Sequence, residues 1–180
     1  MRTFSRLLTA FALLACAISP AAAQTGEALL RVEGAFKPIP HPEHVAPKNL
    51  VYKVAWDVTV GPKTPGEVTD GFRTPANFLM MADTSGIPRK NVHLAMIVHG
   101  TATRSLLQND AYKAATGVDN PNIALLEALH GAGVEIIVCG QALVNRNVPR
   151  DKLLPFVKTS ISATLARAVL NAQGYASMTP

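Results

Sequence analysis

An α/β fold, in which helices cover both faces of a parallel sheet, is predicted by two features of the sequence. Strand-like and helix-like segments alternate along most of the chain, as they do where helices connect parallel strands. The two central strand-like runs, VHLAMIV at residues 92–98 and VEIIV at residues 134–138, are apolar at nearly every position. Such runs are expected for strands that are buried on both faces of a sheet.

Residues 1–23 are predicted to be a signal peptide rather than part of the fold. Arg2 and Arg6 precede an apolar run that is too short to span a bilayer and that ends in small residues. This is the pattern of a cleavable export signal. Cleavage after Ala23 would leave a chain that begins at Gln24, and we therefore expect an exported, periplasmic protein.

Cys16 keeps one alternative open for this segment. A lipoprotein signal would place a lipid on Cys16 and anchor the chain through it. Such signals usually have small residues at both positions before the cysteine, whereas Leu14 is large and the apolar run continues past Cys16. Soluble export is therefore the preferred interpretation. No second long apolar stretch follows, so no stable membrane anchor is expected.

Residues 24–49 are predicted to form a proline-rich N-terminal arm. Four prolines fall within residues 38–47. Proline lacks an N–H donor and favours extended backbone, so this segment is expected to be an arm or linker rather than a core element. His41 and His44 lie in it without further ligands nearby in the sequence, and they are interpreted as incidental rather than as a metal site.

The first elements of the domain follow this arm. Residues 50–58 are rich in β-forming side chains and are predicted to be a strand that ends in a Gly- and Pro-rich turn. A helix is expected to begin near Thr74, with Pro75 at its first position, where proline is well tolerated. The apolar strand at residues 92–98 comes next.

A helix and a strand are predicted in the middle of the domain. Asn120 is expected to cap a helix whose apolar residues recur at helical spacing and which ends near Gly131. The apolar strand at 134–138 follows, and residues 141–146 are expected to begin a short helix after it. Its free N–H groups would favour a thiolate on the preceding cysteine.

Three more elements are predicted at the end of the chain. Residues 155–159 form a short strand candidate, and Ser160 is expected to cap the next helix, which closes at Gly174. Residues 175–179 are expected to form a last short strand. The second half of the domain therefore continues the alternation on which the fold prediction rests.

Two chemically reactive side chains, Cys139 and His99, directly follow the two apolar strands. In open α/β sheets the functional crevice lies beyond the carboxyl ends of the strands, so both are predicted on the same rim. Cys139 is the one cysteine that remains after signal removal, and it cannot form an intramolecular disulfide. It is either a thiol kept for sulfur chemistry or a small apolar residue packed at the end of a strand.

His99 has two interpretations as well. Near a thiol, its imidazole could act as a base or orient a bound anion. At the end of a strand, it could equally hold a turn through a hydrogen bond to a loop carbonyl. The structural role is the more common one for a histidine in this position, and His99 is therefore the weaker of the two candidate site residues.

Composition excludes several classes of function. The chain has 17 Lys and Arg against 12 Asp and Glu, and removal of two arginines with the signal leaves a net charge of only +3. No basic run interleaved with aromatic residues is present, so no nucleic-acid partner is expected. The sequence has no GxGxxG motif, no P-loop and no cysteine-rich motif. We therefore expect no cofactor and no metal.

The order and spacing of four segments also resemble those of the DsrE/DsrF-like family, over residues 50–180. These segments are LVYKVAWDV, NVHLAMIVHG, LLEALHGAGVEIIVCGQAL and LARAVLNAQGYASMTP. The resemblance implies a three-layer α/β/α sandwich around a mainly parallel five-stranded sheet, and homo-oligomers that are trimers or hexamers. In sulfur-relay members of the family, a cysteine after the corresponding strand carries a persulfide between proteins, and Cys139 stands at that position.

Two functions follow from these observations. In the first, an exported DsrE-like protein transfers sulfur or forms mixed disulfides through Cys139, with a thiol or persulfide protein as donor or acceptor; whether it is an enzyme stays open. Export departs from the cytoplasmic relay members, because a persulfide outside the cytoplasm is exposed to oxidation. In the second, the chain is a non-enzymatic module that binds a small ligand or a partner, and Cys139 is packing.

Overall fold

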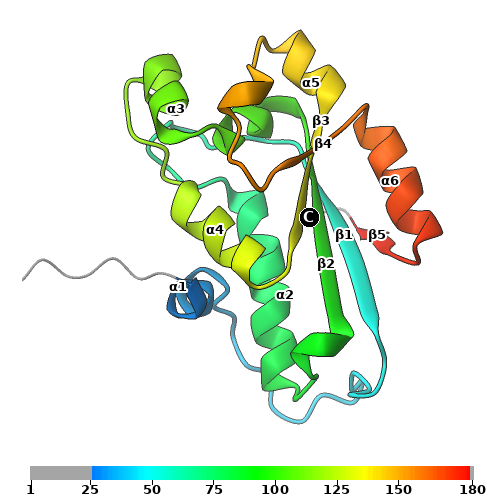
Figure 1. Cartoon of the computed structure of the whole chain (residues 1–180). Coiled ribbons are helices and arrows are strands. Elements are labelled where there is room, and N and C mark those ends of the chain that lie inside the picture. Colours follow the sequence, from blue (N-terminus) through cyan, green and yellow to red (C-terminus); the bar gives the residue numbers. More distant parts are fainter. Residues whose placement is uncertain (1–25, 179–180) are drawn as a thin grey trace, which may run out of the picture.

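Five parallel strands form the central sheet of the computed structural model, which describes residues 26–178 (Figure 1). Their spatial order is β4-β3-β2-β1-β5. The strands are β1 (Tyr52–Val58), β2 (Val92–Val98), β3 (Glu135–Cys139), β4 (Lys158–Ser160) and β5 (Ala176–Met178). The predicted α/β fold with a five-stranded parallel sheet is therefore confirmed. The predicted signal peptide lies outside the described residues.

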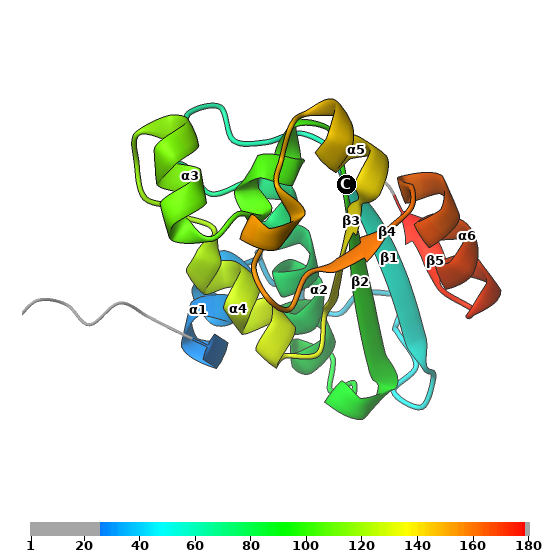
Figure 2. The same ribbon diagram turned by 45° about the horizontal axis from the view of Figure 1, so that its top comes forward.

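Helices lie on both faces of this sheet, so the three-layer arrangement is also confirmed (Figures 1 and 2). The α-helices are α1 (Gly26–Glu33), α2 (Arg73–Thr84), α3 (Asn109–Thr116), α4 (Ile123–Gly131), α5 (Gly140–Asn145) and α6 (Ala163–Ala172). Short 3₁₀ helices are η1 (Asp70–Phe72), η2 (Arg89–Asn91), η3 (Gly100–Leu106) and η4 (Arg150–Lys152). Helices α2 and α4 pack on one face with α1 outside them, and α6 covers the other.

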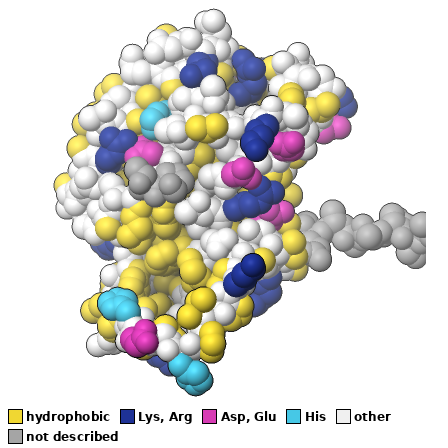
Figure 3. Space-filling view, turned by 180° about the vertical axis from the view of Figure 1, so that it is seen from behind, with side chains coloured by type: hydrophobic (Ala, Val, Ile, Leu, Met, Phe, Trp, Pro, Cys, Tyr) yellow, Lys and Arg dark blue, Asp and Glu magenta, His cyan; other side chains and the backbone are white. Residues whose placement is uncertain are grey.

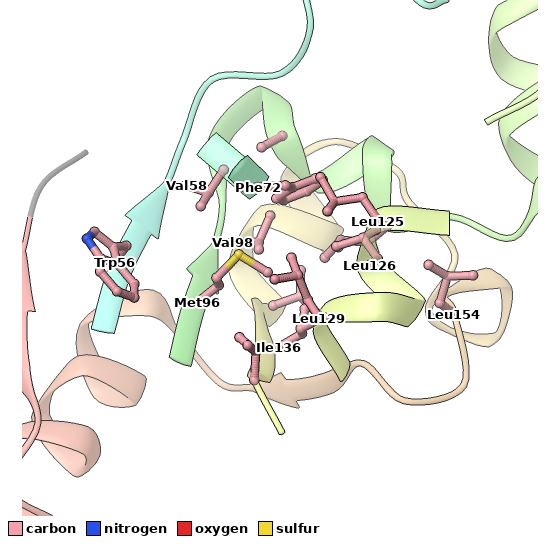
Figure 4. Packing of buried hydrophobic residues seen from close by; sticks show 14 of the residues in the cluster. Trp56, Val58, Phe72, Met96, Val98, Leu125, Leu126, Leu129, Ile136 and Leu154 are labelled. Atoms are coloured by element: carbon pink, nitrogen blue, oxygen red, sulfur yellow. The ribbon is translucent and has the colours of Figure 1, made fainter. Parts of the chain in front are cut away.

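The main hydrophobic core lies on the face covered by α2 and α4, which we call the thick face. Alternate residues of β1, β2 and β3 point into it, and they meet large side chains from the helices (Figure 4). Its fully buried members include Phe72, Met96, Leu125, Leu126 and Leu129. Burial of this apolar surface is the largest favourable contribution to folding.

The first helix lies in the segment predicted to be a proline-rich arm. Leu30 of α1 is only 1% exposed and belongs to the main core. Glu33 ties the end of this helix to α2, because Arg73 Nε donates a hydrogen bond of 2.6 Å to its carboxylate. The prediction that no core element precedes residue 50 was therefore wrong for α1. The four prolines begin only after it, and residues 41–44 are exposed.

The N-terminus of α4 differs from the prediction. Asn122 rather than Asn120 is its N-cap residue. The amide of Asn120 is buried, and it donates to the carbonyl oxygens of Ser105 and Leu107 at 3.0 and 2.7 Å. Its Oδ1 accepts a hydrogen bond of 3.0 Å from the Asn122 N–H, so Asn120 joins the end of η3 to the start of α4.

The N-terminus of α6 and the start of β4 also shift. Ser162 rather than Ser160 caps α6, since its Oγ accepts a hydrogen bond of 3.1 Å from the N–H of Leu165. β4 begins three residues later than predicted, because a turn closed by the Val157 N–H and the Leu154 carbonyl comes first. Within residues 26–178, no helix combines the length and apolar character needed to cross a membrane.

Candidate functional site

Cys139 is the last residue of β3 and the residue before α5, at the carboxyl end of the sheet. It is buried, with 7% of its surface exposed. Its side chain lies on the face covered by α6, which we call the thin face. There it belongs to a small apolar cluster with Ile97, Ile137, Ala163 and Ala166. The thiol thus lies at the rim, but beneath a helix rather than open to solvent.

The cover over this rim depends on Gly140, the first residue of α5. A Cβ atom at Gly140 would lie 2.8 Å from the carbonyl oxygen of Ser160 and 3.3 Å from that of Ile161. Ser160 ends β4, and Ile161 begins the loop that leads to α6. The Gln141 N–H donates a hydrogen bond of 3.2 Å to the Ile161 carbonyl. Glycine is therefore required so that this loop can close over the residue that follows Cys139.

His99 follows β2, the strand next to β3, and Val98 pairs with Val138 in the ladder between them. The structure therefore places His99 and Cys139 on neighbouring strands at the same rim. The His99 ring, however, is held on the other side of β2: its Nε2 lies 3.1 Å from Asp57 Oδ1 on β1. No hydrogen bond joins the ring to the Cys139 thiol in the part of the chain that the structure describes.

Asp57 connects His99 to α6. Arg167 of α6 donates two hydrogen bonds to its carboxylate, from Nε at 3.0 Å and from Nη2 at 2.6 Å. This bidentate, charge-assisted pair raises the pKa of Arg167 above its ordinary value, and burial opposes the shift. Side-chain exposures of 16% for Asp57 and 34% for Arg167 leave the pair at the edge of the thin face. It fastens α6 across the ends of β1 and β2.

Asp57 and Arg167 were not among the predicted site residues. A signal for Asp57 was present, because it is a charged residue near the carboxyl end of the strand YKVAWDV, next to the apolar run VAW. Such a residue needs a partner once the strand is covered. Nothing in the sequence pointed to Arg167 as that partner, since 110 residues separate the two.

A groove of about 720 Å³ lies beside the covered thiol. Gly140 and Gln141 of α5 form one wall, and Thr159, Ser160 and Ile161 form the other. Val144 and Ile161 are 73% and 71% exposed on its rim, so the groove is apolar at its mouth. Cys139 does not line it; the thiol lies behind Gly140.

Comparison with known proteins identifies the family. Residues 61–180 match the DsrE/DsrF-like family. The chain belongs to it. The matched region contains Cys139, His99 and Arg167, whereas Asp57 lies before it. Most of the predicted span, residues 50–180, is included, and the expected resemblance is therefore confirmed.

Two solved structures of DsrE-like proteins are similar to the fold of this family member. The YchN protein of E. coli has 18% sequence identity and a TM-score of 0.50, over 72% of this chain and 99% of that one. A protein of unknown function, MTH1491 from Methanobacterium thermoautotrophicum, has 15% identity and a TM-score of 0.45, over 72% and 99% of the two chains. At this identity the likeness to YchN concerns the fold alone. No curated protein matches the sequence significantly.

Proposed function

We propose that this DsrE-family protein is an exported sulfur carrier whose Cys139 accepts a sulfane sulfur and hands it to a second thiol. The observation that carries the proposal is the place of Cys139 within the fold. It ends a central strand at the carboxyl rim of a parallel sheet, where ligands of such sheets bind, and it directly precedes a helix. It is also the one free cysteine among the described residues.

The reaction at Cys139 would be a pair of thiol exchanges. The Cys139 thiolate attacks the outer sulfur of a donor persulfide, R–S–SH; a new S–S bond forms as the donor's S–S bond breaks, and the donor leaves as R–S⁻. An acceptor thiolate then attacks the same outer sulfur and releases Cys139 as a thiolate. The proton stays with the transferred SH group, and no net oxidation or reduction occurs.

Access to the thiol requires a change in its cover. Because Cys139 is only 7% exposed, a partner thiol cannot reach it while the β4–α6 loop lies against Gly140. The loop is fastened to α5 by one backbone hydrogen bond, from Gln141 to Ile161. We therefore expect reaction through an open form in which this loop has moved, and a rate limited by how often that form occurs.

Intact mass spectrometry of the folded protein tests the carrier function. After incubation with glutathione persulfide, the wild-type protein should gain one sulfur atom and lose it again when a thiol acceptor is added. The Cys139→Ser variant should gain none. The carrier function is overturned if native Cys139 resists both the persulfide and iodoacetamide, while the denatured chain is fully alkylated.

A second candidate function is a non-enzymatic binding or assembly module in which Cys139 is packing. The apolar surroundings of the thiol favour it. Three residues on the outer side of α6 and the loop before it, Ile161, Leu165 and Val169, recur every four positions and are 46–71% exposed. Hydrophobic side chains also gather around a hollow on the back of the molecule (Figure 3). Apolar surface of this kind is the usual basis of self-association.

On this view the chain forms a homo-oligomer, a trimer or a hexamer, through such faces. Light scattering at micromolar concentration should report more than one copy, and Leu165→Glu together with Val169→Glu should shift the assembly toward monomers. Cys139→Ser is the matched control and should leave the oligomer intact. A wild-type protein that is monomeric at this concentration would remove the assembly function without affecting the carrier function.

Export is part of the proposal as well. The protein purified from an exporting host should begin at Gln24 and carry no lipid, because the small residues before it form a better cleavage site than the sequence around Cys16. N-terminal sequencing and intact mass measure this directly. A diacylated chain that begins at Cys16 would contradict soluble export.

A further inference from the structure

A second cavity lies at the carboxyl rim, away from Cys139, between the segment after β2 and the segment after β3. Its volume is about 400 Å³, which is within the range of small-molecule sites. Three cationic side chains line it: Arg104 of η3, Arg146 after α5 and Lys152 of η4. No carboxylate is among the residues that line it.

The cavity is held together by backbone contacts between the two segments. Leu107 and Leu153 form an antiparallel bridge. On either side of it, the Gln108 N–H donates to the Lys152 carbonyl at 2.8 Å, and the Leu154 N–H donates to the Leu106 carbonyl at 2.9 Å. The end of η3 and the chain that follows α5 accordingly lie side by side (Figures 1 and 2). This frame fixes the backbone at Lys152 and close to Arg104.

Two of the three cationic side chains in this cavity have no counter-charge among the described residues. Within residues 26–178, Arg104 and Arg146 form no ion pair and donate no side-chain hydrogen bond to the protein. Lys152 pairs with its exposed neighbour Asp151 at 3.5 Å, which weakens its own contribution. Like charges that converge without a counter-charge repel one another, and an anion placed between them relieves that repulsion.

The remaining wall is apolar. It consists of Leu107, Ala111, Ala114, Ala115, Val148 and Pro149, and the Asn147 amide adds one neutral polar group. Alanines at 111, 114 and 115 present one side of α3 without long side chains, which leaves room for the body of a ligand. The cavity thus combines an anion-attracting end with an apolar surface, as sites for small organic anions do.

We propose that this cavity binds a small organic anion, such as a carboxylate, sulfonate or phosphate that carries a short apolar or aromatic group. The two arginines contact the anionic head through charge-assisted hydrogen bonds, for which guanidinium groups are well suited. The alanines of α3 contact the apolar part. This site is independent of Cys139, and its failure would leave the carrier function untouched.

Nuclear magnetic resonance titration with benzenesulfonate tests the proposal, with the neutral benzenesulfonamide as the matched ligand. Benzenesulfonate should cause saturable shifts of amide signals around the cavity, at Ala111, Ala115 and Asn147. Benzenesulfonamide and inorganic phosphate should each bind at least tenfold more weakly, because the first lacks the charge and the second lacks the apolar group. Equal binding of either would overturn the proposed ligand class.

Charge-removing variants locate the site. Arg104→Gln combined with Arg146→Gln should weaken benzenesulfonate binding at least tenfold. Both side chains are exposed and unpaired among the described residues, so the double variant should fold normally, which the unperturbed remainder of its spectrum would show. Lys90→Gln, which removes a charge at the opposite end of β2, should leave binding unchanged. If the arginine double variant binds as tightly as the wild type, the site is wrong.

Discussion

The two faces of the sheet are closed in different ways. On the thick face, large side chains such as Phe72, Met96 and Leu126 fill the space between the strands and two helices. On the thin face, half of the buried cluster found in the described residues consists of alanine: Ala55, Ala95, Ala163 and Ala166. Small residues allow α6 to lie close to the sheet, but they remove little apolar area from water. Burial of apolar area therefore stabilises the packing on the thin face less than the packing on the thick face.

This difference explains where the reactive groups lie. Asp57, His99, Arg167 and Cys139 all belong to the thin face or its rim. Buried polar side chains near the thick face, such as Asn120 and Asn122, are instead fully used in hydrogen bonds that hold loops in place. A face covered by one helix keeps polar groups partly hydrated, and the proposed chemistry at Cys139 would require this face to open.

The largest expected change in the free energy of unfolding comes from truncation of a core side chain, which we compare on the two faces. Phe72→Ala on the thick face should lower the free energy of unfolding by about 3–5 kcal/mol, because it leaves a large cavity among rigid neighbours. Leu170→Ala on the thin face should cost about 2–3 kcal/mol, since a cover of small residues can partly collapse. Urea denaturation measures both. An equal or larger loss for Leu170→Ala would contradict the comparison.

Gly140→Ala should open the thin face at the rim. The new methyl group would meet the Ser160 carbonyl at 2.8 Å and push the β4–α6 loop outward, at a cost of about 1–3 kcal/mol. Because this loop leads into α6, which covers Cys139, iodoacetamide should label the thiol faster than in the wild type. Gly131→Ala is the matched control: no atom lies within 4 Å of its added Cβ, and it should stabilise α4 slightly without changing the labelling rate.

Sequence patterns were sufficient to predict the sheet. The apolar runs that became β2 and β3 have no other stable position than between two helix layers, and Cys139 and His99 follow them directly. The environment of the thiol could not be predicted, because it depends on how closely α6 approaches through Ala163 and Ala166. The direction of the His99 ring depends likewise on Asp57, in a strand whose place next to β2 no local pattern reveals.

The errors in the predicted helix ends, and the missed helix α1, also reflect contacts that local sequence does not reveal. Asn120 and Ser160 carry the residue types of helix caps, but the N-cap position of each helix lies two residues later, at Asn122 and Ser162. α1 was missed because the prolines that follow it dominate the composition of its segment, while one buried leucine is a weak helical signal. Propensity thus located the strands and the helices α2, α4, α5 and α6 to within a few residues, but it missed α1 and α3 and did not fix the ends of the others.

Removal of the Asp57–Arg167 ion pair, which holds α6 to the sheet, should lower the free energy of unfolding by an intermediate amount. Arg167→Gln leaves the carboxylate of Asp57 with His99 as its remaining partner, and we expect a loss of about 1–2 kcal/mol in urea denaturation. Cys139 labelling should again become faster. Lys158→Gln, which breaks an exposed pair with Glu135 on the same face, is the control and should change neither quantity appreciably. Unchanged labelling in Arg167→Gln would show that this pair does not restrain the cover.

The smallest expected change in the free energy of unfolding comes from loss of an ion pair at the end of α2, on the thick face. Arg89 donates hydrogen bonds to Asp83 at 2.9 and 2.7 Å, and these bonds lower the pKa of Asp83 below its ordinary value of 3.8, against an opposing effect of burial. The pair therefore stabilises the fold at pH above 3.8, and its contribution is lost as the pH falls through the lower folded-state pKa. Asp83→Asn should cost about 0.5–1 kcal/mol at pH 7 and progressively less below pH 3.8. Because Asp83 is remote from α6, Cys139 labelling at pH 7 should stay at the wild-type rate; faster labelling would mean that the two faces do not open independently.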